Sequence, residues 1–260
     1  MPVPERRPLR AVHTSDVHLG TYSSSKDENW NKRRDEMEQA FANVITVANE
    51  VAADVLLIAG DFFDNDRIED RVAHFAGEQI ERFAGRTYLL PGNHDPMDPG
   101  RVYWRYDLEA MAPRLRIIRD HAGEALEDPE LDLVVWGRGY LESDWHFRPI
   151  AGIPRRLDDR WHIAMAHGHF VRNESDLNRS LLITEREIVD MAGQWDYLAL
   201  GHWDPHTDIS SGGMTAVYSG CPLAMTGANT KAGWVSVIDF DEQGTRWHVQ
   251  RVDPLERGER

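Results

Sequence analysis

Carboxylate, imidazole and amide side chains gather in short clusters, and each cluster directly follows an apolar run of the chain. Such side chains are ligands for borderline divalent metals. The set is larger than a single tetrahedral zinc site requires, and it suits a pair of metals that share a bridging carboxylate and bind a phosphoryl group. The clusters, in chain order, are Asp16-Val17-His18, Gly60-Asp61, Gly92-Asn93-His94-Asp95, His167-Gly168-His169 and Gly201-His202-Trp203-Asp204-Pro205-His206.

The apolar runs that precede these clusters are expected to be strands of one α/β fold. In open α/β sheets, the carboxyl ends of the strands form the crevice that binds ligands. Amphipathic helical patterns lie between the first runs, and apolar residues from Met37 to Val51 recur at helical spacing. We expect strands at residues 9–15, 54–59, 86–90, 115–118, 131–136, 161–166 and 195–200, and helices at 37–51, 66–83 and 103–111.

The last part of the chain is rich in strand patterns joined by glycine-containing turns, at residues 215–218, 233–240 and 245–252. Continuous apolar strands that alternate with amphipathic helices favour a sheet covered on both faces. The strand-rich end adds a second sheet. We therefore predict an α/β fold, a four-layer α/β/β/α sandwich of two mixed sheets flanked by helices, formed as a single domain by residues 1–260.

Composition narrows the class of protein. The 260 residues include 29 Lys and Arg against 44 Asp and Glu, a net charge of −15, which opposes non-specific binding to nucleic acid. The single cysteine, Cys221, excludes an intramolecular disulfide and fits a reducing compartment. No apolar run approaches the ~18 residues of a membrane span, and no signal peptide is visible. We expect a cytoplasmic protein with no membrane partner.

The clusters resemble, in order, the sequence blocks of the calcineurin-like metallophosphoesterases. The resemblance extends from residue 9 to about residue 225. Within that superfamily the chain is most similar to the SbcD-type nuclease subunits of bacterial DNA-repair complexes. The stretches that carry this similarity are His13-Thr14-Ser15-Asp16-x-His18-Leu19-Gly20, Ala59-Gly60-Asp61-x-Phe63-Asp64, Asp196-Tyr197-x-Ala199-Leu200-Gly201-His202 and Tyr218-Ser219-Gly220-x-Pro222.

The resemblance implies a role for each cluster. His94 would face the substrate and either stabilise the charge of the phosphorane-like transition state or protonate the leaving oxygen, and Asp95 would orient His94. Metal-bound hydroxide would be the nucleophile, and the two divalent ions would be manganese first, with iron or zinc as alternatives. The implied metal ligands are Asp16 and His18 for the first metal, Asp61 as the bridge, and Asn93, His167 and His202 for the second.

One position departs from the family pattern, which usually closes with Gly-His-x-His. Here Asp204 stands at the fourth place, and a carboxylate oxygen can take the same coordination position. The alternative is that His206 binds the first metal instead. Two neighbours of the ligands, Trp203 and His169, are candidates for substrate contacts, and His169 could also support a metal ligand.

These features predict a hydrolase that cleaves phosphodiester bonds, either a nuclease or an enzyme acting on a small molecule such as a cyclic nucleotide. A phosphomonoesterase is the alternative, and a non-catalytic scaffold of the same fold is a third interpretation. SbcD-type chains carry a capping domain and a helical tail that docks an ATPase, whereas this chain stops at Arg260. We therefore expect a phosphate-ester substrate, and the missing parts argue against an ATPase partner. Nucleic acid stays a possible substrate that the net charge does not favour.

Overall fold

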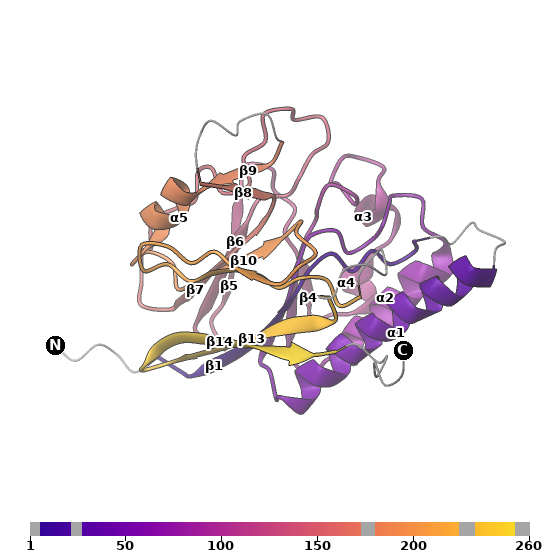
Figure 1. The fold of residues 1–260 in the computed structure, drawn as a ribbon, viewed down its shortest axis with the longest axis horizontal. Coiled ribbons are helices and arrows are strands. Elements are labelled where there is room, and N and C mark those ends of the chain that lie inside the picture. Colours follow the sequence, from indigo (N-terminus) through magenta and orange to yellow (C-terminus); the bar gives the residue numbers. More distant parts are fainter. Residues whose placement is uncertain (1–5, 22–27, 173–179, 224–231, 253–260) are drawn as a thin grey trace.

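The computed structural model describes residues 6–21, 28–172, 180–223 and 232–252. Two six-stranded sheets form the centre of the molecule (Figure 1). None of the helices in these ranges is long and apolar enough to cross a membrane.

The first sheet has the order β14-β13-β1-β2-β3-β4. Its strands β1 to β4 are parallel, and the hairpin of β13 and β14 adds two antiparallel strands at the β1 edge. The strands are β1 (Leu9–Thr14), β2 (Val55–Ala59), β3 (Arg86–Leu90), β4 (Leu115–Ile117), β13 (Trp234–Asp241) and β14 (Gly244–Arg251).

The second sheet has the order β11-β12-β10-β7-β6-β5. Its central strands β12, β10, β7 and β6 are parallel, and each edge strand is antiparallel to its neighbour. A small parallel pair, β8 and β9, lies beside it. The strands are β5 (Glu124–Asp128), β6 (Leu133–Gly137), β7 (Trp161–His167), β8 (His169–Val171), β9 (Leu182–Thr184), β10 (Tyr197–Gly201), β11 (Thr207–Asp208) and β12 (Ala216–Tyr218).

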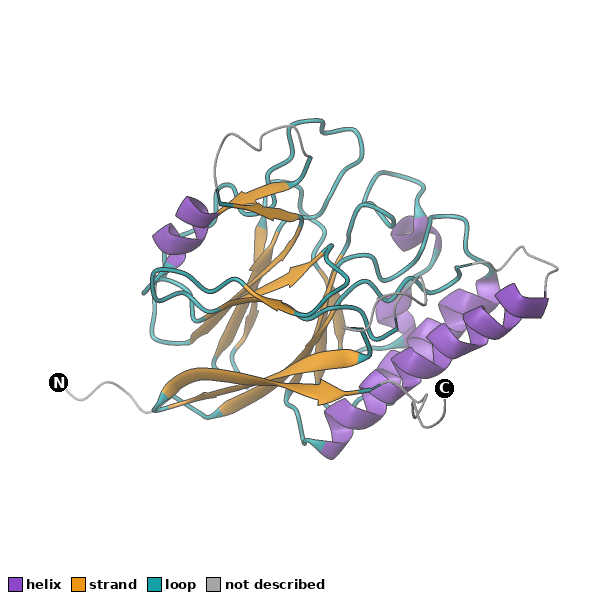
Figure 2. Ribbon diagram, in the orientation of Figure 1, coloured by secondary structure: helices purple, strands orange, loops and turns teal. Residues whose placement is uncertain are grey.

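Helices cover the outer faces of the two sheets, as Figure 2 shows. Alternate residues of β2 explain the layering, because Leu56 and Ile58 pack against the helices while Leu57 packs against the second sheet. The outer face of the second sheet packs against α5. The helices are α1 (Glu28–Glu50), α2 (Asp70–Glu81), α3 (Val102–Arg105), α4 (Leu108–Met111) and α5 (Glu185–Met191). The predicted α/β/β/α sandwich is confirmed.

Some local predictions differ from the structure. The helix expected at 103–111 is two short helices, and Asp107 between them accepts a hydrogen bond from the backbone N–H of Ala110. The sequence interpretation missed β5, β8, β9, β11 and α5. The start of α5 did carry a signal, because Thr184 and Glu187 form a capping box.

Candidate metal centre

The predicted metal ligands lie at the carboxyl ends of parallel strands in both sheets. Because β2 lies against β7 and β10 of the other sheet, the strand ends of the two sheets meet at one place. The ligands are Asp16 and His18 after β1, Asp61 after β2, Asn93 after β3, His167 at the end of β7 and His202 after β10.

The backbone at several of these residues is left-handed. Asp16, His18, Asp61 and His202 have φ values of 53°, 51°, 50° and 92°. Non-glycine residues seldom adopt this conformation, and it concentrates at functional sites, where the surrounding structure imposes it. The strain therefore marks the same residues that the sequence pattern selects.

The side chains form two overlapping groups of ligand atoms that share one carboxylate. Asp16, His18 and Asp61 make one group, and Asp61, His167 and His202 make the other, with the ligand atoms of each group within 4.8 Å of one another. Asp61 Oδ2 lies 3.3 Å from His167 Nε2 and 3.9 Å from His18 Nε2. Asp61 is thus the carboxylate common to both groups, and it would bridge two cations if each group held one.

Asn93 joins the second group. Its Oδ1 lies 3.1 Å from His167 Nε2 and 2.9 Å from His202 Nδ1. Asp16 also links the groups, because both of its carboxylate oxygens lie 3.0 Å from the backbone nitrogen of His202. The oxygen and imidazole donors of this set fit divalent metals of the first transition row.

In two of the predicted ligand histidines, the ring nitrogen that points away from Asp61 contacts another residue. His167 Nδ1 donates to the carbonyl of Ala59 at 3.0 Å, which leaves Nε2 to face Asp61. His18 Nδ1 lies 3.4 Å from Asp64 Oδ1, on the side away from Asp61. These contacts orient the rings for metal binding.

In the absence of a metal, attraction between protonated histidines and carboxylates stabilises the centre. Burial alone would lower the pKa of His167, but the charges of Asp61 and Asp16 raise it to about 9. Burial also lowers the pKa of His18, but the contact with Asp64 and the charge of Asp61 outweigh it and raise this pKa to about 9. Both rings are therefore protonated at neutral pH in the metal-free protein, and metal binding has to displace these protons.

The pKa of His202 is shifted in the opposite direction. Burial, and then the neighbouring rings of His167 and His169, lower its pKa to about 3. Its imidazole is therefore neutral at neutral pH. A neutral ring has one lone pair to offer a metal, and Nδ1 is the nitrogen that lies beside Asn93 and His167.

Asp95 does not orient His94, contrary to the prediction. The fully buried Asp95 carboxylate accepts hydrogen bonds from the backbone N–H groups of Gly92 and Phe63, at 2.7 and 2.9 Å, and from the Tyr103 hydroxyl at 2.6 Å. It therefore ties the loop after β3 to the loop after β2. Nothing in the sequence pattern indicated the role of Tyr103.

The exposed ring of His94 is oriented by a different residue. Its Nδ1 donates to the backbone carbonyl of Asp64 at 2.8 Å, and its backbone N–H donates to Asp61 Oδ1 at 2.8 Å. The His94 ring meets the His18 ring edge-on at 4.7 Å. Asp64 thus holds both His18, with its carboxylate, and His94, with its carbonyl.

The structure brings neither Asp204 nor His206 into the described ligand groups. The ring of His206 packs 5.1 Å from that of Trp247, and its Nε2 is buried without a hydrogen-bond partner among the residues that the structure describes. Burial, and then the charges of Asp204 and Asp16, raise the pKa of the Cys221 thiol, which lies near both carboxylates. Whether Asp204 or His206 supplies the fourth ligand of the first metal stays a prediction.

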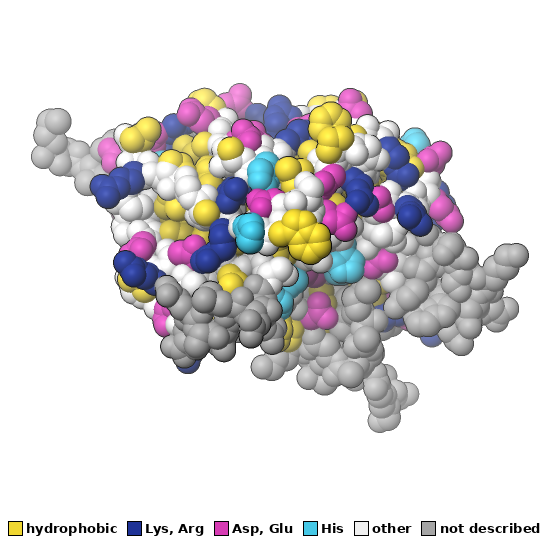
Figure 3. All heavy atoms as spheres, turned by 90° about the horizontal axis from the view of Figure 1, so that it is seen from above, with side chains coloured by type: hydrophobic (Ala, Val, Ile, Leu, Met, Phe, Trp, Pro, Cys, Tyr) yellow, Lys and Arg dark blue, Asp and Glu magenta, His cyan; other side chains and the backbone are white. Residues whose placement is uncertain are grey.

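The remaining candidates, His169 and Trp203, lie beside His202. His169 Nε2 is 2.9 Å from His202 Nε2, and the Trp203 side chain is exposed. Figure 3 shows histidine side chains reaching the surface among acidic and large apolar side chains. Such a surface offers both polar and stacking contacts to a substrate.

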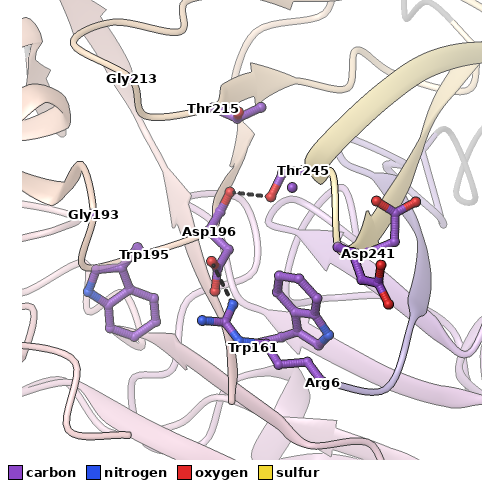
Figure 4. Close-up of a pocket in the computed structure, with 11 residues that line it drawn as sticks. Arg6, Trp161, Gly193, Trp195, Asp196, Gly213, Thr215, Asp241 and Thr245 are labelled. Atoms are coloured by element: carbon purple, nitrogen blue, oxygen red, sulfur yellow. Dashed lines mark hydrogen bonds and ion pairs between the residues drawn. The ribbon is translucent and has the colours of Figure 1, made fainter. Parts of the chain in front are cut away.

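A separate cavity of about 730 Å³ lies at the opposite ends of the strands, beside the first residue of β7 (Figure 4). Two of its charged groups are paired, because Arg6 stacks 4.5 Å from the Trp161 ring and lies 3.4 Å from Asp196. Arg156 also binds Asp196, at 2.8 Å. None of the predicted metal ligands lines this cavity, so it is distinct from the candidate metal centre.

Comparison with known proteins agrees with the fold and identifies the family. A family model described as calcineurin-like phosphoesterase matches residues 9–203. The matched segment contains the strands and loops that carry Asp16, His18, Asp61, Asn93, His167 and His202. The chain belongs to the calcineurin-like phosphoesterase family.

Solved structures share the fold at low sequence identity. TT1561 of Thermus thermophilus is 12% identical, with a TM-score of 0.58, over 95% of this chain and 100% of that chain. A predicted phosphoesterase from Streptococcus pneumoniae is 10% identical, with a TM-score of 0.45, over 95% of this chain and 91% of that chain. The first similarity supports the fold alone.

Proposed function

We propose that the protein is a hydrolase of phosphate esters that uses two divalent metal ions, Mn²⁺ foremost, and that its target is a phosphodiester bond. The observation that carries the proposal is the pair of ligand groups sharing Asp61, with the exposed His94 beside them. Family membership supports the class of reaction. A protein that kept the fold only as a scaffold would have no use for this arrangement.

The metals, when bound, would activate water and stabilise charge on the phosphoryl oxygens. Asp16 and His18 would hold the first ion, and Asn93, His167 and His202 the second, with Asp61 between them. Because Asp61 also accepts the His94 backbone N–H, the bridging carboxylate fixes the position of His94 relative to both ions.

His94 would act as the general acid. Its Nδ1 faces a carbonyl, which can only accept, so Nδ1 carries a proton and Nε2 is left for the substrate. In the imidazolium form, Nε2 can give its proton to the oxygen of the departing alcohol. The Asp64 carbonyl keeps the ring oriented during this transfer.

Two features favour a diester over a monoester. The motif stretches of the sequence resemble those of SbcD-type nuclease subunits. In addition, the exposed Trp203 follows His202 directly and offers an apolar face to the second substituent of a diester. A monoester has no such substituent, and its extra negative charge would meet a protein of net charge −15.

The test is the Mn²⁺-dependent kcat/KM for a matched aryl phosphodiester and aryl phosphomonoester in one buffer. We expect a preference for the diester of at least about tenfold, and we expect the preference to fall when Trp203→Ala removes the indole. A monoester preference would contradict the diester assignment, but the protein would still be a phosphoesterase. No turnover of either ester with Mn²⁺, Fe²⁺ or Zn²⁺ would contradict the proposed activity.

A further inference from the structure

We propose that His169 is a positioning residue, which fixes the tautomer and orientation of His202 and thereby sets metal affinity at the second ion. This inference rests on the proposed function, because it assigns His202 to that ion. The two imidazoles meet through their Nε2 atoms at 2.9 Å, with ring centroids 4.1 Å apart and planes at 88°. Such an edge-on contact between nitrogens requires one ring to donate and the other to accept.

The direction of this hydrogen bond follows from the other face of His202. His202 Nδ1 lies 2.9 Å from Asn93 Oδ1 and 3.3 Å from His167 Nε2, within the ligand group of the second ion. To bind a metal there, Nδ1 must be unprotonated, which places the proton of the neutral ring on Nε2. His202 therefore donates, and His169 Nε2 must accept.

His202 differs in this respect from His167. A carbonyl, that of Ala59, fixes the proton of His167 on Nδ1, and a carbonyl can only accept. His202 relies instead on an imidazole, which accepts at Nε2 only in one of its two neutral tautomers. The tautomer of His202 therefore depends on a side chain, whereas that of His167 depends on the backbone.

The backbone on both sides of His169 is held in place. The Tyr218 hydroxyl donates to the carbonyl of Gly168 at 2.6 Å and accepts from the backbone N–H of Phe170 at 2.9 Å. The N–H of His169 itself donates to the carbonyl of Leu181 at 2.8 Å. Tyr218 is buried on β12, so a core side chain fixes the backbone from which the His169 side chain extends.

Close packing at Gly168 adds to this control. A Cβ at that position would lie 2.2 Å from the carbonyl oxygen of Leu181, so the turn between His167 and His169 admits only glycine. The turn therefore places a ligand of the second ion and the support of another ligand two residues apart on one rigid segment. This geometry favours a supporting role for His169 over a contact with substrate.

The experiment measures Mn²⁺ binding by equilibrium dialysis for the wild type, His169→Ala and His169→Gln. We expect His169→Ala to weaken one of two ions about 10- to 100-fold, the usual effect of losing a partner of a ligand histidine. His169→Gln should recover most of the affinity, because its amide oxygen can accept from His202 Nε2. His248→Ala, an exposed histidine on β14, is the matched control and should bind both ions normally.

Two results would overturn the inference. One is a wild-type affinity for both ions in His169→Ala. The other is equal weakening in the Ala and Gln variants when both have the wild-type circular dichroism spectrum. If His169→Ala does not fold, Tyr218→Phe provides the same test, because loss of the hydroxyl should weaken one ion while the other stays bound. Failure of the wild type to bind two ions would instead contradict the proposed function.

Discussion

At the scale of the residue, the histidines of the centre are defined by what each nitrogen faces. His18 and His167 turn Nε2 toward Asp61, and His202 turns Nδ1 toward Asn93. His94 is exposed. Its ligand atom lies near those of His18 and Asp64, and His94 is not a member of either ligand group that contains Asp61. His94 thus stands apart from the two groups around Asp61, as the proposed role of general acid requires.

This separation predicts the behaviour of His94→Ala. The variant should retain both ions with wild-type affinity, since its backbone N–H still donates to Asp61. Its kcat on an aryl diester should fall by about 10²- to 10⁴-fold, the usual contribution of a general acid. Single-turnover kinetics and metal analysis on the same sample check both statements. Near-normal kcat in a fully loaded variant would show that another group gives the proton.

At the scale of the element, strand ends and the glycines beside them decide whether the ligands meet. Gly60 has a φ of +89°, and a Cβ there would lie 2.0 Å from His167 Nδ1. The first and second sheets can therefore approach each other at the centre only because this residue has no side chain.

Gly60→Ala should accordingly displace His167 and break its hydrogen bond to Ala59. We expect a loss of the second ion and a lower Tm, because both the backbone conformation and the packing are disturbed. Gly100→Ala is a suitable comparison, since Gly100 also has positive φ but a Cβ there meets no atom within 4 Å. Equal metal binding by the two variants, measured by dialysis, would argue against close approach as the reason for glycine.

The sequence predicted much at this scale. Apolar runs such as Val55–Ala59 indicated the strands, and the polar residues after them indicated the ligands that the structure brings together. The short β8 and β9 carried too few residues for a periodic pattern. The contacts of Asp95 with Phe63 and Tyr103 depend on how loops pack, and spacing along the chain contains no such information.

At the scale of the whole molecule, buried charges make the stability of the metal-free protein depend on pH. The pKa values of His18 and His167 are raised from 6.5 to about 9, so their stabilising effect is complete below pH 6.5 and is lost as the pH rises toward 9. His13 and His202 have pKa values lowered to about 3 by burial first, so they destabilise the fold as the pH falls below 6.5.

The free energy of unfolding of the metal-free protein should therefore be greatest near pH 6.5. Denaturant titrations at about pH 5, 6.5 and 9 in the presence of a chelator would show this maximum. With Mn²⁺ bound, His18 and His167 are already deprotonated, so the decline between about pH 6.5 and 9 should shrink. A chelated protein that is most stable at about pH 9 would contradict the charge pattern described for the centre.

The central claim is that Asp61 is shared between two ions in one site. The most direct measurement is the metal content of the purified wild-type chain after dialysis against Mn²⁺ and gel filtration. Elemental mass spectrometry gives the manganese concentration, which is divided by the protein concentration. The geometry of the two ligand groups predicts two ions per chain. One ion per chain, or none, would contradict it.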